Sequence, residues 1–137
     1  MVQWELIILL GILYLLAYIV VIFGGSFFVG RFLNPYKKSE TNTDSTGLAG
    51  AGKKIGMTER AIILTLALLG EYGAISFVFV AKSMARFEQL KKRHFAEYYL
   101  LGTLLSILFA LFVALILQGL ITILANTYFP DLQNLWK

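Results

Sequence analysis

Glu71 is the side chain whose position most directly suggests chemistry. It lies inside an otherwise apolar segment, Ala61 to Ala81, between Gly70 and Gly73. An ionisable residue at membrane depth usually marks an ion path, a proton relay or a buried polar pair. One hypothesis is therefore a cation or proton site. The other is structural: a carboxyl group that caps a bend at the two glycines.

A second group of charged residues flanks the same segment. Glu59 and Arg60 precede it, and Lys82 and Arg86 follow it. Together they could form a basic pocket for an anionic lipid headgroup on the cytoplasmic side. The alternative is that Glu59 lies in the first turn of a helix, where its charge complements the dipole, and that Arg60 anchors the membrane interface.

The remaining reactive groups do not indicate an enzyme. The chain has no Cys, which excludes disulfides, thiol catalysis and thiolate metal sites. Its one His, His94, has no partner at the spacing of metal ligands. The segment from Gly47 to Lys54 matches a phosphate-binding loop except at Lys54, where the motif has the Ser or Thr that holds magnesium. We therefore expect no catalysis, no cofactor and no metal.

Apolar helices must position these residues. The runs Leu6–Gly30 and Tyr98–Leu124 contain no ionised side chain, and each exceeds the roughly 20 residues that span a bilayer. Of the 12 Lys and Arg residues, all but Lys137 lie between the two runs. Because cytoplasmic loops carry the excess of Lys and Arg, we expect the N-terminus outside and the basic part inside. We assign the net charge of +4 to this orientation and to anionic lipid headgroups, not to nucleic acid.

The middle segment admits two architectures. As a spanning helix it would place the basic residues that follow it outside the cell, whereas a hairpin keeps them in the cytoplasm. In contrast, Arg60, Glu71 and Lys82 are eleven residues apart, close to three helical turns, and would share one face of a continuous helix. We predict an all-α integral membrane protein with three apolar helical segments, the middle one kinked or re-entrant at Gly70–Gly73.

The expected organisation is a single membrane domain, because no polar stretch is long enough for a separate soluble domain. Its expected parts are a first transmembrane helix (4–33), a flexible cytoplasmic linker (34–56), the middle helical segment (57–81), an amphipathic interfacial connector (82–97), a last transmembrane helix (98–126) and a short tail (127–137).

Small side chains recur at every fourth position of the last apolar run, and the stripe continues into a glutamine. Such a stripe lets another helix approach closely, and the amide can hydrogen-bond across the helix pair. We predict a helix-packing seam whose partner is either the first helix or a second protein chain. Its residues are Gly102, Ser106, Ala110, Ala114 and Gln118.

The stretch from Gly47 to Phe87, with Phe95–Ser106 after it, resembles a known family. The features that carry the resemblance are Gly52, Gly56, Glu59-Arg60, the Gly70 region, Ala81-Lys82-Ser83, Arg86-Phe87, and Glu97-Tyr98 before Gly102-Thr103. The family is a prokaryotic group of uncharacterised integral membrane proteins, known as a domain of unknown function, and the resemblance is to its C-terminal membrane part. It implies a protein of the prokaryotic cytoplasmic (inner) membrane and supplies no activity.

Two functional hypotheses follow from the sequence. In the first, the chain is a non-catalytic membrane protein that acts by helix packing as a subunit or accessory factor, through self-association or with another membrane protein. In the second, it is a small oligomeric channel or transporter that uses Glu71 as an intramembrane cation or proton site.

Overall fold

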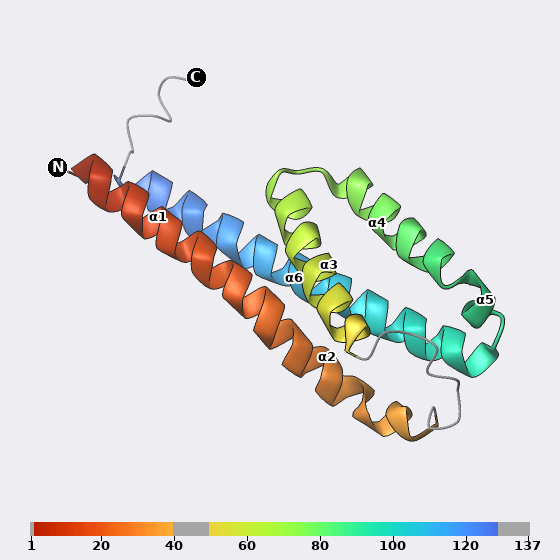
Figure 1. Ribbon diagram of the computed structural model, residues 1–137. Helices are drawn as coiled ribbons and strands as arrows, with labels where there is room; N and C mark the ends of the chain where they lie inside the picture. The colour runs from red at the N-terminus through yellow and green to blue at the C-terminus, as the bar shows by residue number, and fades with distance from the viewer. Residues whose placement is uncertain (1, 40–49, 129–137) are drawn as a thin grey trace.

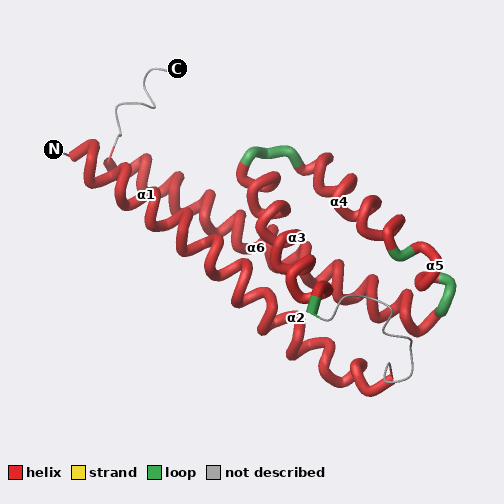
Figure 2. Tube along the Cα trace, viewed as in Figure 1, coloured by secondary structure: helices red, strands yellow, loops and turns green. Residues whose placement is uncertain are grey.

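The structure is a computed structural model that describes residues 2–39 and 50–128. Within these ranges every regular element is a helix (Figure 1), so the predicted all-α class is confirmed for the described residues. Short turns join the helices at the tip of a hairpin and on either side of a four-residue helix (Figure 2). The central part of the expected linker, 40–49, and most of the expected tail, 129–137, lie outside the described residues.

The first apolar run forms one long helical rod. It consists of α1 (Val2–Ile19), the π-helical turn η1 (Val20–Gly24) and α2 (Gly25–Leu33), followed by the 3₁₀ turn η2 (Asn34–Ser39). The α-helix ends at Leu33, and Asn34 keeps right-handed helical dihedral angles (φ −53°, ψ −41°) although Pro35 follows it.

The last apolar run forms α6 (Arg93–Tyr128), which lies antiparallel to this rod (Figure 1). Among the described residues, these two helices are long and apolar enough to cross a membrane, over Trp4–Tyr36 and Arg93–Tyr128. Only 11% and 28% of their most apolar windows are buried inside the protein, so most of this apolar surface faces outward.

The middle segment forms a hairpin of two helices, α3 (Ala51–Leu68) and α4 (Tyr72–Ala85). A Schellman motif ends α3: the N–H of Glu71 donates to Leu66 O at 2.9 Å and the N–H of Gly70 donates to Ala67 O at 3.1 Å. Gly70 has a φ of +76°, a conformation that favours glycine. The continuous helix that would align Arg60, Glu71 and Lys82 therefore does not form.

Three element boundaries differ from the expectation. First, α3 begins at Ala51, so the end of the expected linker is helical and Glu59 lies two turns inside the helix instead of in its first turn. Second, the expected connector 82–97 is not one amphipathic helix, since α4 continues to Ala85 and the short α5 (Phe87–Leu90) follows. Third, α6 begins at Arg93.

The core lies where the rod, α3 and α6 meet. Val21 of η1, Ile63 and Leu64 of α3, and Ala110 of α6 are all fully buried there. In the same region the hydroxyl groups of Tyr18 and Thr65 form a hydrogen bond of 2.6 Å. Both ends of the α3–α4 hairpin lie near the end of the bundle where α2 stops and α6 starts, and the N-terminus lies at the opposite end (Figure 1).

Candidate functional site

Arg60 is buried at the meeting point of three elements. It is 4% exposed, and its guanidinium donates to Ser106 Oγ of α6 at 3.4 Å, to Ile22 O of η1 at 3.4 Å and to Ser26 Oγ of α2. Arg60 therefore lies buried between helices and not on an exposed surface of the protein. None of these acceptors is charged, so no carboxylate accepts a hydrogen bond from this buried cation among the described residues.

A glycine makes this position of Arg60 possible. A Cβ atom on Gly25 would lie 2.6 Å from Arg60 Cδ and 2.7 Å from Arg60 Nε. Any larger residue would therefore collide with the middle of the arginine side chain. The π-helical turn immediately before Gly25 presents Ile22 O, which accepts hydrogen bonds from Arg60 and from the Ser26 hydroxyl. Short π-helical turns of this kind are frequent at functional sites.

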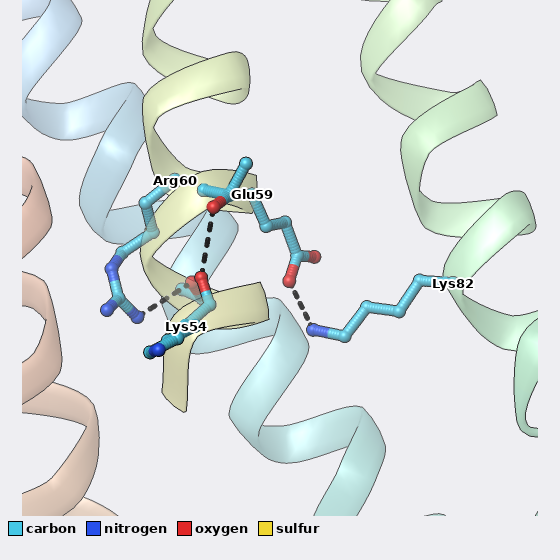
Figure 3. Close-up of polar contacts among 6 residues, drawn as sticks. Lys54, Glu59, Arg60 and Lys82 are labelled. Carbon is cyan, nitrogen blue, oxygen red and sulfur yellow. Dashed lines mark hydrogen bonds and ion pairs between the residues drawn. The ribbon is translucent and has the colours of Figure 1, made fainter. Parts of the chain in front are cut away.

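The Glu59 side chain points away from Arg60, to the opposite side of α3 (Figure 3). It is 5% exposed, and its Oε2 atom forms an ion pair with Lys82 Nζ of α4. The same ammonium lies 5.4 Å from the centroid of the Tyr99 ring of α6, within cation–π range. Lys82 thus connects α4 with both α3 and α6.

The N-terminus of α3 carries a second basic cluster. The helix starts after Gly50, whose φ is +78°, and no side chain caps it. Lys53 and Lys54 are exposed in the first turn. From the C-terminal end of α4, Arg86 reaches back over this turn, because a Cβ on Gly52 would lie 4.0 Å from one of its guanidinium nitrogens. The first N–H groups of a helix have no intrahelical acceptor and attract anions.

The charged residues Glu59, Arg60 and Lys82 and the basic cluster at the N-terminus of α3 line one cleft of about 960 Å³. Its walls come from α2, α3, α4 and α6 and combine apolar side chains with five basic residues and one acidic residue, an excess of four positive charges among the described residues. The residues that line it are Ser26, Val29, Gly30, Leu33, Asn34, Gly52, Lys53, Lys54, Ile55, Gly56, Thr58, Glu59, Arg60, Ile62, Val78, Lys82, Ala85, Arg86, Phe95, Tyr98, Tyr99, Gly102, Thr103 and Ser106.

Glu71 does not join this cluster. It lies exposed at the tip of the hairpin, where its side chain makes no capping hydrogen bond to α4. His94 is also exposed, in the first turn of α6. Within the described ranges, no group of three or more His, Cys, Asp or Glu residues could hold a metal ion.

The small-residue stripe of α6 faces the protein's own helices. Ser106, Ala110 and Ala114 are at most 3% exposed. A Cβ on Gly102 would lie 3.0 Å from Leu33 Cδ1, and Gln118 Nε2 donates to Ala67 O of α3 at 3.3 Å. The partners of the stripe therefore include both the first helical rod and α3.

The four charged candidates Glu59, Arg60, Lys82 and Arg86 all line the cleft, as the lipid-headgroup hypothesis requires. Lys53 and Lys54, in the first turn of α3, also line the cleft but were not among the predicted headgroup residues. Ser106 was predicted only as a small packing residue, and Ser26 was not among the predicted site residues, yet both accept a hydrogen bond from Arg60. Their hydroxyl groups were the available signal, because a buried arginine needs acceptors.

No protein-family model, curated protein or solved structure matches this chain.

Proposed function

We propose that this chain is a non-catalytic integral membrane protein, acting as an accessory factor, whose basic cleft binds an anionic phospholipid at the cytoplasmic face. In this proposal α1–α2 and α6 each cross the bilayer, and the N-terminal end of α1 and the C-terminal end of α6 lie outside the cell. The mostly outward-facing apolar surface of these helices supports this arrangement, because a soluble protein would bury such long apolar helices.

In this proposal the α3–α4 hairpin enters the membrane from the cytoplasm and returns. The uncharged part of α3, from Ala61 to Leu68, rises by about 12 Å at 1.5 Å per residue, which is less than half of the roughly 30 Å hydrocarbon core. The reversal at Gly70 supports the same conclusion. A hairpin of this kind keeps Lys82 and the basic residues after it on the same side as Lys53 and Lys54, as the positive-inside rule favours.

The observation that carries the proposal is the charge of the cleft. A pocket between helices with an excess of four positive charges suits a lipid phosphate, and basic pockets on the cytoplasmic side commonly bind such headgroups. Lys53, Lys54 and Arg86 surround the N-terminus of α3, where the helix dipole adds to the positive potential. The apolar walls suit the start of the acyl chains.

Lipid titration by native mass spectrometry tests the proposal. The protein is reconstituted in phosphatidylcholine nanodiscs, and phosphatidylglycerol is added. We expect the anionic lipid to bind in preference to phosphatidylcholine. Replacement of Lys53, Lys54 and Arg86 by Ala should weaken binding by about 100-fold, since each basic residue contributes about 1 kcal/mol near a lipid surface.

A matched control separates the cleft from net charge. Replacement of Lys91, Lys92 and Arg93 by Ala removes the same charge from positions that do not line the cleft. This control should bind phosphatidylglycerol nearly as tightly as the unaltered protein. Equal losses in the two triple variants would contradict the proposal, because binding would then follow net charge alone.

The ion site and the free packing seam that the sequence suggested have weaker support than the cleft. Glu71 is exposed at the hairpin tip, and within the described residues no group of three or more His, Cys, Asp or Glu side chains gathers that could line a cation path. The α6 stripe packs against the chain's own helices, so it does not offer a free seam to another protein.

A further inference from the structure

One oxygen of the Glu59 carboxylate has no donor. Its Oε2 atom pairs with Lys82, but Oε1 is buried without a hydrogen-bond partner among the described residues. A buried carboxylate oxygen without a donor destabilises the fold and calls for an explanation such as a missing ligand. Because Glu59 lines the cleft, a hydrogen-bond donor on the bound molecule is the explanation that fits this position.

The charges around Glu59 determine the kind of donor. Lys82 Nζ already occupies the other carboxylate oxygen, and Arg60 is a buried cation held by uncharged acceptors. Arg60 Nε also has no hydrogen-bond partner within the described part of the chain. A second ammonium group, as in an ethanolamine headgroup, would be repelled by both cations. A hydroxyl group donates to Glu59 without adding positive charge.

The lining of the cleft extends along α3 from Gly52, at the N-terminal end of the helix, to Glu59. Glu59 follows Gly52 by seven residues, or about 10 Å along the helix axis. Lys54 and Arg86 line the same cleft as Glu59, and Arg86 lies close to Gly52 at the N-terminal end of α3. A headgroup attached to a phosphate beside Arg86 therefore extends along the cleft toward Glu59.

We propose that the cleft selects a phosphodiester lipid whose headgroup carries a free hydroxyl, such as a glycerol headgroup. The phosphate lies at the N-terminus of α3 beside Arg86, and the hydroxyl donates a hydrogen bond to Glu59 Oε1. Lys82 is a positioning residue that fixes the orientation of the carboxylate. This inference rests on the proposed function, because it names the lipid that the same cleft would bind.

A comparison of two anionic lipids tests the selection. Phosphatidylglycerol and phosphatidylethanol carry the same phosphodiester charge, but only the first has headgroup hydroxyls. In competition for the protein in phosphatidylcholine nanodiscs, we expect phosphatidylglycerol to bind about tenfold more tightly, the effect of one hydrogen bond to a charged acceptor. In Glu59→Met, which has a side chain of similar length, this ratio should fall to about one, while phosphatidylethanol still binds.

Each outcome separates this inference from the proposed function. Equal binding of the two anionic lipids to the unaltered protein, with both above phosphatidylcholine, would overturn the hydroxyl selection and leave the anionic site intact. No preference for either anionic lipid would overturn both proposals. A preference for phosphatidylglycerol that persists in a folded Glu59→Met protein would remove Glu59 from the assignment. The comparison in the unaltered protein decides the selection even if the variant does not fold.

Discussion

Replacement of Gly25 by Ala tests the position of Arg60 most sharply. The added Cβ would lie 2.6 Å from Arg60 Cδ, 2.7 Å from Arg60 Nε and 3.2 Å from Phe109 Cδ1. These Arg60 atoms lie in the middle of a side chain whose end is held by three acceptors, so they cannot move aside easily. Overpacking of this kind usually costs about 1–3 kcal/mol.

Gly30→Ala is the matched control, because Gly30 lies in the same helix and its added Cβ would meet nothing within 4 Å. Both variants gain the same helix propensity, up to about 1 kcal/mol. The difference between them therefore isolates the collision, and we expect Gly25→Ala to be less stable than Gly30→Ala by about 1–3 kcal/mol.

The free energies of unfolding can be compared by titration with SDS in mixed micelles, with helix content followed by circular dichroism. Equal stability of Gly25→Ala and Gly30→Ala would refute the reasoning, because Arg60 could then not lie against Gly25.

Three further predictions concern the hairpin and its buried cation. Arg60→Lys should lower the free energy of unfolding by about 1–3 kcal/mol, because a single ammonium nitrogen cannot take the positions of both terminal guanidinium nitrogens that donate to the three acceptors; unchanged stability in SDS titration would contradict this. Gly70→Ala should lower the free energy of unfolding by about 1–2 kcal/mol, because the φ of Gly70 is +76°. Gly73→Ala should leave the free energy of unfolding unchanged or raise it, because nothing lies within 4 Å of the added Cβ. Equal effects of the two substitutions would argue against the left-handed turn. In intact cells, an impermeant thiol reagent should label Thr127→Cys and not Ser83→Cys, and external labelling of Ser83→Cys would exclude the re-entrant hairpin.

The long helices were predictable because apolar runs without charges carry a strong signal. The break near Gly70 was one of two open alternatives, since the glycines indicate a bend while the eleven-residue spacing of charged residues favours a continuous helix. The structure favours the bend through local backbone chemistry: a positive φ and the two hydrogen bonds that end α3.

The start of α3 was missed because its first residues have the composition of a linker. Gly52 and Gly56 are poor evidence for a helix on propensity alone, yet α3 begins at Ala51. Because α3 starts earlier than expected, Glu59 lies away from the helix start and Lys53 and Lys54 lie in the first turn, where they line the cleft.

The burial of Arg60 depends on residues far away in the chain. Its acceptors lie 34, 38 and 46 residues away, on α2, η1 and α6. The sequence indicates that Ser26 and Ser106 are small residues suited to helix packing, but only the three-dimensional arrangement brings both hydroxyl groups to one guanidinium. The membership of Glu59, Lys82 and Arg86 in one pocket was a stated hypothesis, and the geometry supports it.

Photo-crosslinking tests most directly whether the cleft is a lipid site. Membranes that contain the protein are supplied with a photoreactive phosphatidylglycerol, illuminated and digested, and the modified peptides are identified by mass spectrometry. The account predicts modification at residues 50–54 and 82–86, reduced by excess unlabelled phosphatidylglycerol but not by phosphatidylcholine. Modification confined to the outward faces of α1 and α6, and insensitive to competition, would contradict it.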